Sequence, residues 1–381
     1  MDWSGLVVPQ LLGIKAYQPG ITAQKLRRET GLSEAFKFSS NESPVKPSPA
    51  IDAAMRAAML DANRYPDAQA LLDRLAAHLD VPVGCLVLGN GSIDLIAALV
   101  RMFVSAEHNI VLSQYGYSAY PAFGIELGAK LRIAPSGPHF GHDVDQLLAA
   151  VDERTRIILI DTPTNLSGQA IKPADIARLI EQLPPHVVLV LDEAYAEFVE
   201  PGDPIARHAL QLPLRHPNVV VTRTFSKAYG LAGLRVGYAV ADAGLIGYLN
   251  RVRPPFPVGG VALAGALAAL EDHVHLERIV TNARSGRLQL AQGLSEAGIA
   301  VVDGTANFLL ADFGVAAKFV YEKLLSKGFI TRAMHAYGLP THIRISIGTA
   351  EENARLIDAI AQLLQLHDEQ TKAPAIELAA S

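Results

Sequence analysis

Cysteine is almost missing from this chain. Cys85 is the only one in 381 residues, and a disulfide within the chain needs two. Proteins that depend on disulfides are mostly secreted, whereas a chain with so little cysteine is typical of a reducing compartment. We therefore expect a cytoplasmic protein without internal cross-links.

Strong charge of one sign and long apolar runs are also missing. The 33 basic and 38 acidic residues give a net charge of −5. No segment is rich in Lys or Arg, so neither nucleic acid nor a membrane is expected as a partner. The most apolar stretch, residues 258–270, is 13 residues long, whereas a membrane-spanning helix needs about 20. The first residues lack the basic start and apolar core of a signal peptide.

The sequence motifs of several enzyme classes do not occur. There is neither the GxSxG turn of α/β-hydrolases nor the GxxxxGK[ST] loop of nucleotide hydrolases. His273 and His275 would diverge on a helix, so no metal site is expected there. Ser226 and Lys227 are adjacent and lack the spacing of a Ser-x-x-Lys nucleophile. The chemistry must come from another arrangement.

The pattern of apolar runs predicts an α/β fold. Near-continuous β-branched runs alternate with helical segments from residue 86 to about 253, which is typical of a mostly parallel sheet flanked by helices. A chain of this length is expected to form two lobes. The candidate strands of the large lobe are residues 85–88, 109–112, 130–133, 156–160, 187–191, 219–222 and 236–239.

The two ends of the chain are expected to build a small α+β lobe. Helical periodicity is present at residues 49–60 and 70–79, and over a long, broken stretch from about 257 to 296. Strands are expected at 306–311 and 342–347, followed by a helix at 350–366. We therefore predict an N-terminal arm with part of the small lobe (1–48), a large lobe (49–255), and a linking helix with the small C-terminal lobe (256–381).

Lys227 is the central candidate for catalysis. It lies in the segment Thr224–Gly230 and follows a candidate strand, as do Asn165 and Asp192. Because ligands collect beyond the carboxyl ends of parallel strands, these side chains are expected to converge. Pyridoxal 5′-phosphate (PLP) needs an amine to hold its aldehyde as an imine and to move protons. A lone lysine is usually a solvated surface residue; this ordered set predicts a PLP site.

Three further side chains suit the pyridine ring of PLP. Asp192 can keep the ring nitrogen protonated, which PLP requires to act as an electron sink. Asn165 and Tyr195 can hydrogen-bond the ring's phenolate oxygen. Taken singly, they would pass as a helix N-cap, a turn asparagine and a core tyrosine. Tyr117 is a candidate to stack on the ring, with an ordinary core aromatic as the alternative.

A glycine-rich turn suits the cofactor's phosphate. Gly89–Ser92 leads directly into a helical run, and the N-terminus of a helix offers free N–H groups and a positive dipole end to an anion. Ser226 and Arg235 would complete the site. By itself the turn is weak evidence, since Ser92 can also be a plain N-cap.

Two arginines near the C-terminal end are candidates for binding a substrate anion. Arg344 lies between two isoleucines of a candidate strand, so it faces away from them and can clamp a carboxylate or phosphate. Arg332 precedes it by twelve positions (344 − 332). The simpler interpretation for either is a surface ion pair.

Together these motifs resemble the fold-type I, aspartate aminotransferase-like PLP enzymes, and most closely the histidinol-phosphate aminotransferases. The resemblance runs from about residue 14 to 365. The lysine segment carries most of it, and the other matching segments are shorter. They are residues 17–20, 39–44, 65–67, 89–92, 192–195, 224–238 and 344–348.

The resemblance implies an aminotransferase that moves the amino group of L-histidinol phosphate to 2-oxoglutarate. It implies a homodimer, because the tyrosine matching Tyr65 reaches the neighbouring subunit's cofactor in relatives. Lys227, Asp192 and Tyr195 would be catalytic, and Tyr17, Asn41, Arg332 and Arg344 would bind substrate. The implied cofactor-binding residues are Gly91, Ser92, Ile93, Tyr117, Asn165, Asp192, Tyr195, Ser226, Lys227, Arg235 and Tyr65.

The substrate is less narrowly defined than the cofactor. Lys46, the pair Ile93-Asp94 and the segment Thr164–Ser167 depart from the usual motifs of the family. An aminotransferase for phenylalanine or tyrosine and a threonine-phosphate decarboxylase share most of the remaining motifs and stay as alternatives. A PLP-sensing regulatory module is the non-enzymatic alternative and ranks last.

Overall fold

The structure is a computed structural model that describes residues 1–14, 20–200 and 209–372. It divides into two compact units, each built from separated parts of the chain. Residues 42–48 and 256–281 lie in the first unit, so its limits differ from the boundaries at 48 and 255 expected from the sequence. The first unit is Met1–Gln18, Glu42–Thr281 and Asp303–Asn307; the second is Pro19–Asn41, Asn282–Val302 and Phe308–Ser381.

The described residues of the first unit form a seven-stranded sheet with the order β2-β8-β7-β6-β5-β3-β4. In this sheet β8 runs antiparallel to the other six strands, which confirms the predicted mostly parallel α/β fold. The strands are β2 (Leu86–Asn90), β3 (Asn109–Ser113), β4 (Lys130–Ala134), β5 (Thr155–Asp161), β6 (Val188–Asp192), β7 (Val219–Thr224) and β8 (Val236–Val240).

The central strands β3, β5, β6 and β7 are buried on both faces, because apolar side chains fill most of their successive positions. In β5, Ile158 and Ile160 belong to one hydrophobic cluster, whereas Ile157 and Leu159 belong to a second one. Successive side chains of a strand point to opposite faces, so the two clusters are the two faces of the sheet. We refer to them as the Ile158 face and the Leu159 face.

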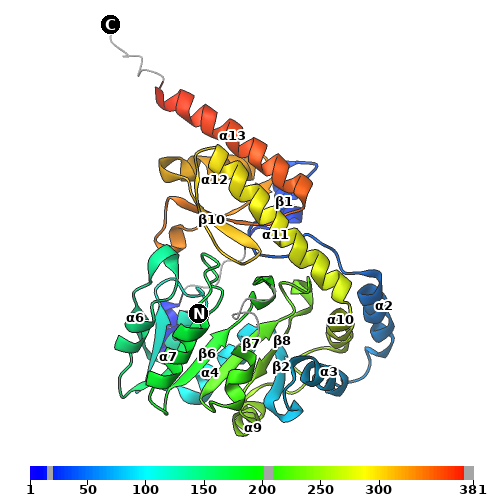
Figure 1. Cartoon of the computed structure of the whole chain (residues 1–381), viewed down its shortest axis with the longest axis vertical. Helices are drawn as coiled ribbons and strands as arrows, with labels where there is room; N and C mark the ends of the chain where they lie inside the picture. Colours follow the sequence, from blue (N-terminus) through cyan, green and yellow to red (C-terminus); the bar gives the residue numbers. More distant parts are fainter. Residues whose placement is uncertain (15–19, 201–208, 373–381) are drawn as a thin grey trace. The chain divides into compact units, whose positions relative to one another are not determined.

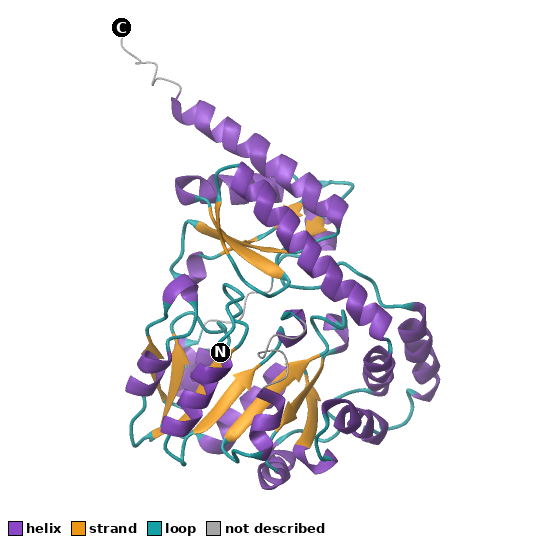
Figure 2. Ribbon diagram, viewed as in Figure 1, coloured by secondary structure: helices purple, strands orange, loops and turns teal. Residues whose placement is uncertain are grey.

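Helices cover both faces, as Figures 1 and 2 show. The Ile158 face packs against α3 (Gln69–Leu79), α6 (Val144–Ala149), α7 (Pro173–Gln182) and α10 (Gly260–Glu271). The Leu159 face packs against α4 (Ser92–Phe103), α5 (Tyr120–Ile125) and α9 (Ala243–Val252). Helix α2 (Pro49–Ala58) packs on α10. The remaining short helix, α1 (Ala23–Thr30), belongs to the second unit.

The long helical stretch expected near residues 257–296 is broken at Asp272, between α10 and α11 (His273–Glu296). The carboxylate of Asp272 accepts the backbone N–H of His275 (2.9 Å) and the hydroxyl of Ser48 (2.6 Å). Ser48 also caps the first turn of α2 through the N–H of Ile51. A single carboxylate therefore starts α11 and ties it to the start of α2.

The second unit has a four-stranded antiparallel sheet with the order β12-β13-β10-β9. Helix α12 (Ala317–Ser326), helix α13 (Ala350–Lys372) and the end of α11 bury their apolar side chains against it. No helix in the part of the chain that the structure describes is long and apolar enough to cross a membrane. The strands are β1 (Phe36–Lys37), β9 (Ala300–Val302), β10 (Phe308–Asp312), β11 (Phe329–Ile330), β12 (Arg332–Ala333) and β13 (His342–Ser346).

Candidate active site

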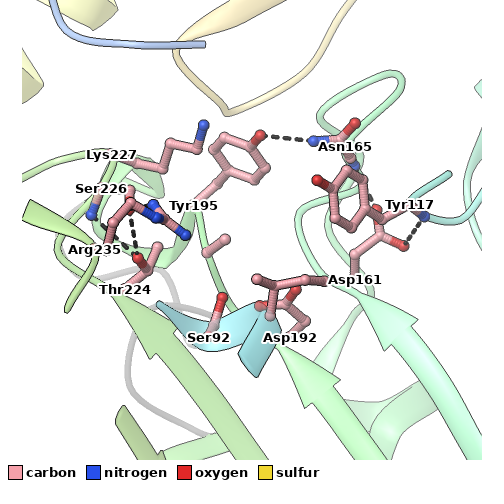
Figure 3. A pocket seen from close by; sticks show the side chains of 12 residues that line it. Ser92, Tyr117, Asp161, Asn165, Asp192, Tyr195, Thr224, Ser226, Lys227 and Arg235 are labelled. Carbon is pink, nitrogen blue, oxygen red and sulfur yellow. Dashed lines mark hydrogen bonds between the residues drawn. The ribbon is translucent and has the colours of Figure 1, made fainter. Parts of the chain in front are cut away.

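A cavity in the first unit lies where β5, β6 and β7 end and α4 begins (Figure 3). The sequence placed nine of its lining residues in a PLP site, so the predicted convergence of strand ends is present in the fold. Asp161, Ala194 and Thr224 also line it and were not predicted. The nine are Ser92, Ile93, Tyr117, Asn165, Asp192, Tyr195, Ser226, Lys227 and Arg235.

Lys227 lies just after β7, and its side chain points toward the cavity (Figure 3). Its Nζ is 5.6 Å from the centre of the Tyr195 ring. The hydroxyl of Tyr195 accepts a hydrogen bond of 2.8 Å from Nδ2 of Asn165 on the far side of that ring. The amine of Lys227, the phenol of Tyr195 and the amide of Asn165 thus lie in this order across the cavity.

Asp192 is a buried carboxylate at the end of β6, with 6% of its surface exposed. Its Oδ2 accepts the hydroxyl of Tyr120 at 2.9 Å, and its Oδ1 accepts that of Thr222 at 3.1 Å. Burial raises the pKa of Asp192 to about 7, and the neighbouring carboxylate of Asp161 adds to this rise. Among the residues that the structure describes, no basic side chain forms an ion pair with Asp192. The carboxylate therefore suits a bound ligand with a cationic group.

The start of α4 also lines the cavity, through Ser92 and Ile93. Gly91 precedes the helix with φ of 80°, a conformation that favours glycine. A Cβ on Gly91 would meet Nη2 of Arg235, and one on Gly237 would meet the backbone of Ser92. The missing side chains let the turn, the helix start and the arginine approach one another closely.

The hydroxyl of Ser226 links Arg235 to the lysine loop. It accepts hydrogen bonds from Nη1 of Arg235 (3.1 Å) and from Oγ1 of Thr224 (2.9 Å). The N–H groups at the start of α4, a hydroxyl and a guanidinium therefore surround one end of the cavity, as an anion such as phosphate requires.

Asp161 is the main residue of the cavity that the sequence analysis missed. The strand prediction stopped at Ile160, but β5 extends through Asp161. A carboxylate at the end of an apolar strand is the signal that had identified Asp192, and it was available here too. Tyr120 and Thr222 had no such signal, because their role depends on contacts with Asp192 across other elements.

Two of the expected cofactor-binding residues do not line this cavity. Gly91 shapes the turn behind it, as described above. The Tyr65 side chain is 83% exposed and stacks on Phe256, with ring centres 4.6 Å apart. Tyr17, expected to bind substrate, lies outside the described residues.

The remaining substrate candidates, Asn41, Arg332 and Arg344, belong to the second unit. Asn41 is buried, and its amide oxygen accepts the hydroxyl of Ser346 at 3.0 Å. Arg332 and Arg344 are direct partners across the antiparallel strands β12 and β13. Like charges in this position repel each other, so the pair favours an anion between or beside them.

A buried ion pair lies beneath the site, on the Ile158 face of the sheet. Arg223 of β7 donates from Nε and Nη2 to Oε2 of Glu193, at 2.8 and 2.7 Å. Glu193 and Arg223 directly follow Asp192 and Thr222, whose side chains are joined by a hydrogen bond. Because alternate side chains point to opposite faces, the ion pair binds the same two strand ends from the other side.

Three comparisons relate this arrangement to known proteins. The family model for aminotransferase class I and II matches residues 33–360. Histidinol-phosphate aminotransferase 1 of Nitrosococcus oceani is 41% identical over 355 residues, covering 93% of this chain and 95% of that protein. The protein of the same name in Thiobacillus denitrificans is 42% identical over 360 residues, covering 93% of each. A crystal structure of histidinol-phosphate aminotransferase from Sinorhizobium meliloti in complex with pyridoxal-5′-phosphate has a TM-score of 0.86 and 29% identity, covering 95% of this chain and 98% of that one.

The chain belongs to the aminotransferase class I and II family. Its fold is the fold-type I, aspartate aminotransferase-like arrangement, and its activity is that of a transaminase. PLP dependence is general to this family, and the buried acid, the lysine and the anion-binding end of the cavity fit that cofactor.

Proposed function

We propose that this enzyme transfers the amino group of L-histidinol phosphate to 2-oxoglutarate, producing imidazole acetol phosphate and L-glutamate in histidine biosynthesis. The relatives named above are histidinol-phosphate aminotransferases that align over more than nine-tenths of the chain. The observation that carries the chemistry is the convergence of Lys227, Asp192 and the start of α4 on one cavity.

Lys227 is the catalytic base in this proposal. When bound, PLP withdraws electrons from the substrate's α-carbon and so makes its proton acidic. The Nζ amine of Lys227, which lines the cavity, would hold the cofactor through its aldehyde. The same amine would accept the proton from the substrate's α-carbon and return it.

Asp192, Asn165 and Tyr195 hold the cofactor's ring. Asp192 keeps a proton on the ring nitrogen, and its own carboxylate is held by Tyr120 and Thr222. Asn165 and Tyr195 are already joined by a hydrogen bond and would hydrogen-bond the ring's oxygen. Tyr117 stacks on the ring from the loop after β3.

The phosphate of PLP is held by the start of α4 together with Ser226 and Arg235. Gly91, Ser92 and Ile93 contribute the helix start, where N–H groups point outward. We further propose that the enzyme is a homodimer in which Tyr65 of each protomer reaches the phosphate bound by its partner. The exposure of Tyr65 in the single chain supports this role.

Arg332 and Arg344 bind the acidic groups of the two substrates in this proposal. Both amino donor and amino acceptor are anions, and two arginines paired across neighbouring strands suit a phosphate or a carboxylate. Asn41 and Tyr17 complete the substrate-binding set. A cytoplasmic location is proposed from the single cysteine, Cys85, which is buried and unbridged.

A single-turnover experiment tests the proposal. The absorbance of the lysine-bound cofactor is followed after separate addition of L-histidinol phosphate, L-phenylalanine or O-phospho-L-threonine. We expect fast conversion to the amine form of the cofactor with histidinol phosphate alone. Faster conversion with phenylalanine would establish an aromatic aminotransferase, and release of carbon dioxide from phosphothreonine would establish a decarboxylase.

A further inference from the structure

Two carboxylates lie side by side among the residues that line the cavity. Asp161 ends β5 and Asp192 ends β6, and the two residues are register partners on these parallel strands. Both are almost fully buried, at 3% and 6% exposure. Both point to the Leu159 face, because they are two positions from Leu159 and Val190 along their strands. Only Asp192 has a role in the chemistry described above.

The oxygens of Asp161 are bound to the backbone of two cofactor-facing residues. Oδ1 accepts the N–H of Tyr117 at 3.3 Å, and Oδ2 accepts the N–H of Asn165 at 2.5 Å. Tyr117 is the proposed stacking ring, and Asn165 carries the amide that reaches Tyr195. One carboxylate therefore joins the loop after β3 to the loop after β5, at the two residues that would face the cofactor's ring (Figure 3).

Gly116 and His142 lie next to Asp161 and leave room or provide a polar partner for it. A Cβ on Gly116 would lie 3.4 Å from Oδ1 of Asp161 and 3.3 Å from the carbonyl of Ser113, so glycine leaves the carboxylate room at the loop. On the other side, Nε2 of His142 lies 2.7 Å from the backbone oxygen of Asp161 and 3.7 Å from its Oδ1. The His142 side chain is itself 1% exposed.

Stability alone is a weak reason to keep an acid in this position. Burial raises the pKa of Asp161, while His142 and the two backbone N–H groups oppose that rise. A buried charge is costly even when it is well partnered, and this one also adds to the rise in the pKa of Asp192. A neutral acceptor could bind the N–H group of one loop with a smaller desolvation penalty. It could not accept hydrogen bonds from both loops with the strength of a carboxylate.

We propose that Asp161 is a positioning residue for the cofactor, which holds the Tyr117 ring and the Asn165 amide at the spacing that PLP requires. The inference rests on the proposed function of this cavity and deepens it. Asp161 touches neither reacting atoms nor phosphate in this role; it acts through the two residues whose backbones it binds.

Three variants test the proposal in the full-length holoenzyme and apoenzyme. Asp161→Asn keeps the shape but offers one accepting oxygen, so one of the two N–H groups loses its partner. Asp161→Ala removes both. The control is Asp152→Asn, just before the start of the same strand, where the carboxylate accepts the N–H of Arg154 and the amide of Asn109 outside the cavity.

The readouts are the dissociation constant of PLP and the visible circular dichroism of the bound cofactor. Losing a charge-assisted hydrogen bond weakens binding by about tenfold to a hundredfold. We therefore expect the dissociation constant to rise from wild type to Asp161→Asn and again to Asp161→Ala. The visible dichroism should fall in the same order, because the ring is held less firmly. Asp152→Asn should change the melting temperature only.

Wild-type affinity and dichroism in both Asp161 variants would overturn the inference, even with a lower melting temperature. If Asp161→Ala does not fold, Asp161→Asn decides by the same two readouts. Failure of the wild-type protein to bind PLP would instead overturn the proposed function, so the two failures are distinguishable.

Discussion

The hydroxyl of Tyr120 donates a hydrogen bond of 2.9 Å to Oδ2 of Asp192, across 72 positions of sequence. This bond joins α5 to the end of β6. Burial raises the pKa of Tyr120 well above its usual value, and the neighbouring carboxylate of Asp192 raises it further, so the phenol remains a donor at neutral pH. In turn, the bond opposes the rise that burial causes in the pKa of Asp192.

Asp192→Asn should stabilise the cofactor-free protein, and more so at high pH. Between the ordinary pKa of 3.8 and the folded value of about 7, the folded state keeps a proton that the unfolded state has released. The contribution of Asp192 to the free energy of unfolding therefore falls as pH rises through that window, by roughly 4 kcal/mol. We expect the melting-temperature difference between variant and wild type to grow from pH 5 to pH 8, as measured by calorimetry. An identical difference at both pH values would contradict the burial argument.

Tyr120→Phe should shift this pH window upward, since the lost hydrogen bond had lowered the pKa of Asp192.

The same Asp192→Asn change should cost most of the activity of the loaded enzyme. The ring nitrogen would lose the anion that keeps it protonated, and kcat should fall by at least a hundredfold. Steady-state kinetics with the preferred donor measure this. Near-wild-type kcat together with higher stability would show that Asp192 does not serve the ring.

Lys227→Ala should abolish turnover and the absorbance of the lysine-bound cofactor. Among the described residues that line the cavity, Lys227 is the only lysine, so we expect no other amine to take its place. The variant should still fold, and its melting temperature is the control. Full turnover in this variant would refute the assignment of Lys227.

Arg332→Ala should impair the enzyme more with a phosphate-bearing donor than with phenylalanine. Arg332 and Arg344 face each other across β12 and β13, so removal of one guanidinium halves the charge presented to the anion. We expect kcat/KM for histidinol phosphate to fall by about tenfold to a hundredfold. An equal loss of kcat/KM for both donors would mean that Arg332 and Arg344 do not recognise the phosphate.

Mixing two inactive variants tests whether Tyr65 acts across a dimer. Subunits with Tyr65→Ala and subunits with Lys227→Ala are combined, unfolded and refolded together. If Tyr65 serves the partner's site, each mixed dimer contains one intact site, and about a quarter of the wild-type activity should return. Each variant refolded alone is the control. If mixed dimers form but no activity returns, Tyr65 does not contribute to the partner's site.

Breaking the ion pair on the Ile158 face should destabilise the protein without removing any cavity residue. Arg223 also lies 3.7 Å from the carboxylate of Glu197, whose side chain is 11% exposed. Arg223→Met therefore leaves both Glu193 and Glu197 uncompensated, which costs about 3–5 kcal/mol. Adding Glu193→Gln to the same protein should recover part of that loss, as chemical denaturation would show. Equal stability of the single and double variants would mean that Arg223 stabilises by packing alone.

The sequence predicted the parts of the site that follow from strand direction. Asn165, Asp192 and Lys227 each follow an apolar strand, and parallel strands bring such positions together wherever their exact ends fall. Tyr120 could not be found in this way, because its partner depends on how α5 packs on the Leu159 face. The two-unit division also escaped prediction in detail, since helix periodicity continues unchanged across Thr281, where the first unit ends inside α11.

The short strand β1 has a consequence for synthesis. Phe36 pairs with Phe329, which is 293 positions later (329 − 36). On the ribosome, residues 36 and 37 therefore remain without their native partner until residue 330 has been translated, whereas most strands of the first unit are made much earlier. The order of translation thus separates the assembly of the two units in time, and chaperones have the longest access to the early residues of the second.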